Sequence, residues 1–232
     1  MAELTNGQGY DVAISYIPEK LIDAVVAKLN TIQPVRASSA NKQYAEREQI
    51  KDLPDISVWW SQMVMDWPEV IEIEAMVSEL IKPQLPLAEW YASDIVVIEG
   101  HSNWVNPHVD TPHRFKKYNY DKRLLGVQAI VSLFDLDKSR GVTGIVPESQ
   151  KQDHNINLCY QGFYNSMFLK KCVQPTLPKG SVLYYNCRLL HSSMPNPQDQ
   201  SRQALLINYL DSSIINDIRT MDNIWESNKD GK

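Results

Sequence analysis

Two histidines and one aspartate have the residue types and the spacing of a metal site. His108 and Asp110 are separated by one residue, so on an extended segment both side chains project from the same face and can converge on one ion. His191 follows the apolar run 182–190 and can supply a third ligand where a strand leaves the sheet. Two neutral imidazoles and one carboxylate leave coordination positions open, which suits non-haem Fe(II) oxygen chemistry.

Each of these signals also has an ordinary structural explanation. A His-x-Asp motif alone often forms a polar turn, and a histidine after a strand often makes only a hydrogen bond at the sheet edge. Arg202, eleven positions after His191, adds a third observation, because a guanidinium that leads into a neighbouring strand can hold a carboxylate bidentately. Ser193 can donate a hydroxyl to the same carboxylate. The alternatives are a surface arginine and a serine that caps a turn.

Four blocks of sequence carry a resemblance to a known family, between about Ile95 and Leu210. The blocks are His108-Val109-Asp110, VQAIVSLFDLDKSRGVTGIVPESQK, GSVLYYNCRLLHSSMPN and SRQALLINYL, whose arginine stands eleven residues after the histidine. In the second block the likeness depends on Gln128, Gly141, Thr143, Pro147 and Ser149. Together the blocks resemble the phytanoyl-CoA dioxygenase-like branch of the Fe(II)- and 2-oxoglutarate-dependent oxygenases.

The resemblance implies a fold and a place for the site. The fold would be mainly β with flanking helices: a double-stranded β-helix, or cupin-like jelly roll, backed by N-terminal helices. His108, Asp110 and His191 would bind Fe(II) between the two sheets, at one mouth.

The resemblance also implies a reaction. 2-Oxoglutarate would chelate the iron through its C1 carboxylate and keto oxygen, Arg202 and Ser193 would meet its C5 carboxylate, and O₂ would take the last position. Conversion of 2-oxoglutarate to succinate and CO₂ would drive oxidation of a substrate C–H bond. Asp110 favours hydroxylation, because related halogenases have a small residue there. Gln128 is a candidate cavity-facing group, with a satisfied core amide as the alternative.

Two positions depart from the family pattern. The chain has Pro147-Glu148-Ser149-Gln150 where the family has proline-glycine-serine-histidine, and Ile130 replaces a strand aromatic. The first change is expected to lose a glycine-dependent turn shape. The second is expected to alter one wall of the co-substrate pocket.

Periodicity predicts the elements that must position these residues. Apolar residues recur at helical spacing over Glu19–Leu29 and from Pro68 to Ile81, and Asp11–Tyr16 reads as an edge strand. Short strands are predicted at Ile95–Ile98, Val127–Phe134, Val142–Val146, Ser181–Asn186 and Ala204–Leu210. Ala37–Asp55 reads as loop. We expect one domain over 1–232, with helical and loop support in 1–90, a jelly-roll core in 91–211 and a tail in 212–232.

Composition narrows the functional class. The 232 residues are 43% hydrophobic and 22% charged, which is typical of a globular domain. The net charge is −5 and no basic stripe is present, which argues against a nucleic-acid partner. Three cysteines without a CxxC pair argue against a disulfide framework or a structural zinc site. With no signal or membrane segment, we expect a soluble cytoplasmic protein with a small-molecule substrate.

Other readings and residues stay open. A cupin-like metalloenzyme that does not use 2-oxoglutarate is one alternative, against which Arg202 argues. A non-catalytic jelly-roll binding module is the other, against which the intact triad argues. Trp104, His113, Arg114 and Tyr160 flank the motifs and are candidates for substrate contact, with packing or solvent exposure as the alternative. The sequence does not indicate the substrate or the oligomeric state.

Overall fold

The computed structural model describes residues 4, 7–32, 35–36, 56–59, 66–98, 100–101, 107–153 and 165–227. The two predicted helices are confirmed: α1 spans Glu19–Leu29 and α4 spans Pro68–Ile81. Both have a proline at or next to the first helical position, where the missing N–H costs nothing. Trp104, Tyr160 and the predicted loop Ala37–Asp55 lie outside the described residues.

Among the described residues, nine strands form two sheets. The larger sheet has the order β1-β7-β5-β9-β4-β3-β2 and the smaller one pairs β6 with β8. The pairings are antiparallel throughout. The strands are β1 (Tyr10–Ala13), β2 (Val35–Arg36), β3 (Ile56–Trp59), β4 (Ala88–Ile98), β5 (Gly126–Ser132), β6 (Gly144–Ile145), β7 (Val182–Asn186), β8 (His191–Ser192) and β9 (Arg202–Asp211).

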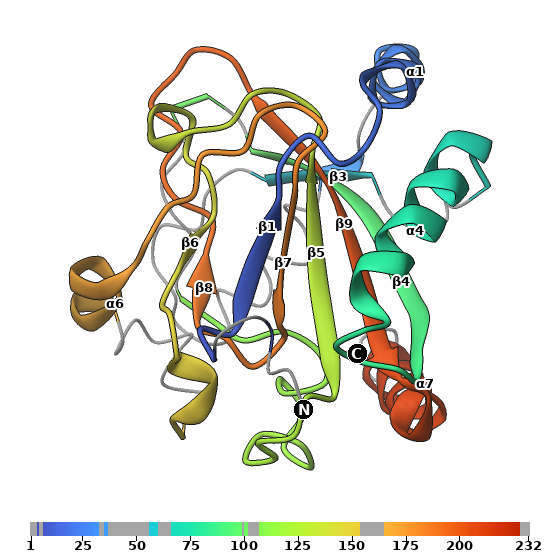
Figure 1. Ribbon diagram of the computed structural model, residues 1–232, viewed down its shortest axis with the longest axis vertical. Helices are drawn as coiled ribbons and strands as arrows, with labels where there is room; N and C mark the ends of the chain where they lie inside the picture. The colour runs from blue at the N-terminus through green and yellow to red at the C-terminus, as the bar shows by residue number, and fades with distance from the viewer. Residues whose placement is uncertain are drawn as a thin grey trace.

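The two faces of the larger sheet have different neighbours. On β5, Val127, Ala129 and Val131 belong to the core that includes buried residues of α1 and α4, whereas Ile130 packs in a second core with Ile145 of β6. This alternation follows from the two-residue period of a strand. Figure 1 accordingly shows α1 and α4 on one side of the larger sheet, and β6 and β8 on the other. The predicted double-stranded β-helix backed by N-terminal helices is confirmed.

The boundaries of the predicted subdivisions differ from the structure in two places. The first ninety residues also supply β1, β2 and β3 to the larger sheet, so they are more than helical and loop support. The expected C-terminal tail contains α7 (Ser212–Ser227), whose Ile214 and Ile218 are buried against other apolar residues. The described part of the chain also contains the short helix α6 (Asn165–Lys171) and the 3₁₀ turns η1 (Lys138–Arg140) and η2 (Ser149–Lys151). Within the described part of the chain, no helix has the length and apolarity needed to cross a membrane.

Candidate metal centre and its cavity

Backbone pairing brings the three predicted metal ligands together from distant parts of the chain. The His108 amide donates to the His191 carbonyl at 2.9 Å, and the His191 amide donates back at 3.1 Å. Two residues later, the Asp110 amide donates to the carbonyl of Cys187 at 2.8 Å. The His-x-Asp segment therefore runs beside β8, and both its side chains reach the histidine of that strand.

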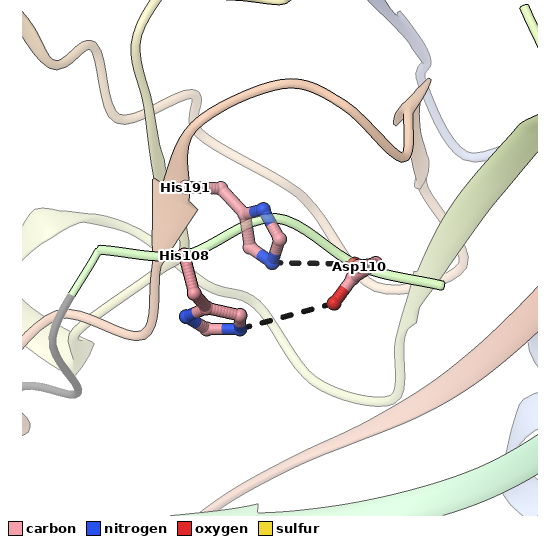
Figure 2. A group of neighbouring side chains, drawn as sticks. All are labelled: His108, Asp110 and His191. Carbon is pink, nitrogen blue, oxygen red and sulfur yellow. Dashed lines mark ion pairs between the residues drawn. The ribbon is translucent and has the colours of Figure 1, made fainter. Parts of the chain in front are cut away.

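The three side chains form a compact donor set, which Figure 2 shows converging on one point. One ligand atom from each residue can be chosen so that all lie within 4.8 Å of one another. Nε2 of His191 lies 3.3 Å from Oδ2 of Asp110, and Nε2 of His108 lies 3.8 Å from Oδ1. Two imidazole nitrogens and a carboxylate at this separation can hold a divalent transition metal.

A backbone carbonyl sets the tautomer of His191. Its Nδ1 lies 3.0 Å from the carbonyl oxygen of Leu189, which can only accept, so Nδ1 carries the proton and donates. In the neutral ring that a metal would bind, the lone pair is then on Nε2, the nitrogen that faces Asp110. The histidine is only 5% exposed and is thus held ready to act as a ligand.

The corner 147–150 supports the approach to His191 and corrects one expectation. Glu148 adopts φ 62°, in the left-handed region, so the turn persists without the family's glycine. The Ser149 hydroxyl donates to the Val146 carbonyl at 2.7 Å and accepts from the Leu190 amide at 2.8 Å. The corner therefore fixes the backbone immediately before His191.

Arg202 begins β9 and points into the same region. It is 6% exposed, and its guanidinium donates to the carbonyl of Gly141 and to the Ser193 hydroxyl, the latter at 3.2 Å. Its Nε is buried and has no hydrogen-bond partner among the described residues. Burial lowers the pKa of Arg202 to about 10, so it remains a cation at neutral pH. A buried cation with an unused donor can take an anion.

A cavity of about 100 Å³ joins these groups. Its polar lining contains all the predicted site residues, together with two residues that were not predicted, Thr143 and Tyr185. The predicted ones are His108, Asp110, Gln128, His191, Ser193 and Arg202. Val96, Ile130, Ala204 and Leu206 form the apolar lining. Ile130 therefore does form part of the wall, as expected for the position that departs from the family aromatic.

Gln128 is both a cavity-facing group and an amide with hydrogen-bond partners inside the protein. It lines the cavity, and its amide is also used within the protein: Oε1 accepts from Nδ2 of Asn208 at 2.9 Å, and Nε2 donates to the Ala129 carbonyl at 3.3 Å. Asn208 is the direct neighbour of Gln128 across β5 and β9. The carboxamide is thus held in place by the sheet.

The two flanking candidates that the structure describes, His113 and Arg114, do not line the cavity. His113 is fully buried, donates Nδ1–H to the Tyr118 carbonyl at 3.0 Å and is not among the described residues that line the cavity. Burial lowers its pKa to about 4, so it is neutral at physiological pH. Arg114 pairs with Asp222 of α7 at 2.6 Å. Both residues stabilise the packing around the segment that follows the metal ligands.

Two side chains near the site were not identified from the sequence. The hydroxyl of Tyr185 donates to Oδ2 of Asp110 at 3.3 Å, and its ring lies 4.7 Å from the His191 ring. The only sequence signal for Tyr185 is that it lies two residues after Leu183, which faces the inner core. Residues two apart on a strand share a face of the sheet.

Arg188 is the second residue that the sequence did not reveal. It is 1% exposed and donates to the carbonyls of Asn119, Gln150 and Gln152, the last at 2.7 Å. These bonds tie the turn between β7 and β8 to the corner at η2. Such partners are set by tertiary structure and leave no local pattern.

Comparisons with known proteins agree with this architecture. The family model for phytanoyl-CoA dioxygenase (PhyH) matches residues 8–204. A comparison with curated proteins returns no match.

Several solved structures share the fold. The epimerase SnoN from nogalamycin biosynthesis, described as non-heme and alpha-ketoglutarate dependent, aligns with a TM-score of 0.67 at 16% identity, over 88% of this chain and 77% of its own. HygX from Streptomyces hygroscopicus, solved with nickel, 2-oxoglutarate and hygromycin B bound, aligns with a TM-score of 0.67 at 11% identity, over 89% and 84%. The carbocyclase SnoK, from the same biosynthesis as SnoN, aligns with a TM-score of 0.62 at 18% identity, over 89% and 81%. By the extent of the family match, which runs from before β1 into β9, the chain belongs to the phytanoyl-CoA dioxygenase family.

Proposed function

We propose that the protein is an Fe(II)- and 2-oxoglutarate-dependent oxygenase that hydroxylates a small molecule. The observation that carries the proposal is a single cavity that holds both the His108, Asp110 and His191 donor set and the buried Arg202 with its unused Nε donor. A metal site alone would fit a cupin-like enzyme. The arginine adds a binding place for a second carboxylate, which is what a dicarboxylate co-substrate needs.

In this proposal each residue has a defined task. His108, Asp110 and His191 would hold the iron, and the bound metal would supply the activation of O₂ that accompanies decarboxylation of 2-oxoglutarate. Arg202 and the Ser193 hydroxyl, already joined by a hydrogen bond, would receive the far carboxylate of the co-substrate. The apolar lining, including Ile130 and Leu206, would limit water around that ion pair and so strengthen it.

The proposal includes a reaction type, hydroxylation, and a substrate class, small molecules. The carboxylate at Asp110 favours hydroxylation over halogenation. Small molecules are supported by the fold neighbour HygX, which was solved with hygromycin B bound. Because two neighbours are named as an epimerase and a carbocyclase, the product must be identified directly. A hydroxylase adds one oxygen atom to its substrate, whereas epimerisation leaves the mass unchanged and ring closure removes two hydrogens.

A binding experiment under anaerobic conditions tests the co-substrate assignment. Fe(II) together with 2-oxoglutarate should produce a weak visible charge-transfer band. Fe(II) alone should not. A cupin-like enzyme without this co-substrate, or a binding module, would give no band.

Turnover then tests the ligand set. A panel of small molecules is screened for succinate release, and the products are analysed by mass. His108→Ala, Asp110→Ala and His191→Ala should each abolish succinate release while circular dichroism stays that of the wild type. Retained turnover in His191→Ala would contradict the triad.

A further inference from the structure

Tyr185 occupies an unusual position in the cavity wall. It is 1% exposed, yet it carries a hydroxyl, and that hydroxyl donates to Oδ2 of Asp110 at 3.3 Å. Its ring lies 4.7 Å from the ring of His191, tilted by 48°. Tyr185, on the strand β7, therefore contacts two of the three proposed metal ligands and lines the cavity.

We infer that Tyr185 is a positioning residue whose hydroxyl holds Oδ2 of Asp110, so that the carboxylate presents Oδ1 to the metal. The inference rests on the proposed function, because it assumes that the triad binds a metal. It concerns a residue that contacts a ligand without being a ligand itself.

The hydrogen bond has a chemical consequence because a carboxylate can bind a metal through one oxygen or through both. An Asp110 that used both oxygens would occupy one more coordination position and leave fewer for co-substrate and O₂. The Tyr185 hydroxyl engages Oδ2, which already lies 3.3 Å from Nε2 of His191. Oδ1, on the side of His108, is then the oxygen available to the ion.

Rigid surroundings make Tyr185 suitable for this task. Its strand is hydrogen-bonded on both sides, to β1 through Tyr10 and to β5 through Gln128. These pairings fix the backbone of Tyr185, and its buried ring packs in a core with Leu183 and Ile130, so the hydroxyl has little room to move away from Asp110. A hydrogen bond from such a fixed donor restricts the rotation of the Asp110 side chain, and partners of this kind typically affect metal affinity.

The adjacent residue provides a matched control. Tyr184 is also buried, and its hydroxyl donates to Oδ2 of Asp11 at 3.1 Å. However, its side chain packs in the core shared with α1 and α4, on the opposite face of β7. Tyr184→Phe and Tyr185→Phe thus remove the same group from a tyrosine–aspartate pair, and only the second faces the proposed metal.

The experiment measures Co²⁺ binding to the metal-free full-length protein by calorimetric titration, without co-substrate. Tyr185→Phe keeps the ring on His191 and should weaken Co²⁺ binding by roughly 10- to 100-fold, the usual effect of losing a partner of a metal ligand. Tyr184→Phe should leave Co²⁺ affinity unchanged. Melting temperatures of the metal-free variants check that both fold. Unchanged Co²⁺ affinity in a folded Tyr185→Phe would overturn the inference.

A double-mutant cycle separates a role through Asp110 from simple packing. In an Asp110→Ala background, Tyr185→Phe should cause no further loss of Co²⁺ affinity, since its partner is gone. An equal loss in both backgrounds would overturn the inference in favour of packing against His191. Failure of the proposed function looks different: wild type and His191→Ala would then bind Co²⁺ equally. A normal dependence on His191 with no effect of Tyr185→Phe would remove only the role of Tyr185.

Discussion

Arg202 combines structural and functional contacts in one side chain. Two of its nitrogens bind the carbonyl of Gly141 and the hydroxyl of Ser193, and Nε remains for a ligand. A hydrogen bond to a charged group contributes about 1.5–3 kcal/mol, so Arg202→Ala should weaken 2-oxoglutarate use by roughly 10- to 150-fold. Arg202→Lys should recover only part of the loss, because an ammonium keeps the charge but not the planar arrangement of donors. Succinate release, measured against 2-oxoglutarate concentration, gives the result.

The control for Arg202 is an arginine far from the cavity. Arg219 lies on the exposed side of α7, and its replacement by alanine should not change the 2-oxoglutarate dependence. Arg140 is less suitable, because it precedes Gly141, whose carbonyl accepts from Arg202. If succinate release by Arg202→Ala depends on 2-oxoglutarate concentration as in the wild type, Arg202 has only a structural role. Arg202 would then no longer argue against a cupin-like enzyme.

Glu148 shows that a turn can keep its shape without its usual glycine. A left-handed conformation costs a residue with a Cβ about 1–2 kcal/mol, and glycine avoids that cost. Glu148→Gly and Glu148→Ala both remove the exposed ion pair with Lys151, so the pair of variants isolates the backbone effect. The glycine variant should be more stable than the alanine variant by about 1 kcal/mol in urea unfolding. Equal stabilities would mean that Glu148 bears no backbone strain.

Single residues were predictable where their chemistry depends on local spacing. His108 and Asp110 form a motif that an extended chain can present, and Arg202 stands at a fixed offset from His191. Tyr185 and Arg188 were not identified because the hydrogen-bond partners of their side chains are far away in sequence. The partner of Tyr185 is 75 residues away, and those of Arg188 are 35 to 69 residues away. His113 looked like a site residue only because it stands near the motif.

At the scale of elements, His113 holds together the segment that follows the metal ligands. Its pKa is lowered to about 4 by burial, against about 6.5 in an unfolded chain. The unfolded state therefore binds more protons between these values, and stability is present above pH 6.5 and lost as the pH falls towards 4. The difference corresponds to a contribution on the order of 3 kcal/mol.

His113→Asn tests this pH dependence. Unfolding free energies of wild type and variant should differ by a constant amount above pH 7, and the difference should shrink on acidification through this window. Contributions from groups that both proteins share cancel in the comparison. A difference that stays constant from pH 7 to pH 4 would show that His113 is not buried neutral in solution.

The elements themselves were predictable in proportion to their periodicity. The helices α1 and α4 have apolar residues at three-to-four spacing because one face packs on the sheet. The strand β6 is only two residues long, shorter than Val142–Val146, because its pairing ends where the η2 corner begins. The helix α7 was taken for a tail because polar residues dominate it and its buried isoleucines cluster near its start.

At the scale of the whole molecule, metal binding should act as a stabilising ligand without being required for folding. The large core between α1, α4 and the sheet contains none of the three proposed ligands. Co²⁺ at 100 times its dissociation constant should raise the free energy of unfolding by about 2.7 kcal/mol, and the melting temperature by roughly 5–10 °C. Thermal scans with and without Co²⁺ measure this shift. His191→Ala should fold and show no shift; a metal-free wild type that fails to fold would contradict the prediction.

The place of β9 in the larger sheet has a consequence for how the protein is made. Arg202–Asp211 is the last strand along the described chain, yet it lies in the middle of the sheet, between β5 and β4. During synthesis, β4 and β5 emerge from the ribosome long before the strand that joins them. Until β9 is made, the apolar faces and facing edges of β4 and β5 stay exposed. Such exposure makes a nascent chain prone to aggregation or to capture by chaperones. Because Arg202 is the first residue of that strand, the molecule gains its proposed co-substrate anchor in the same event that closes its sheet.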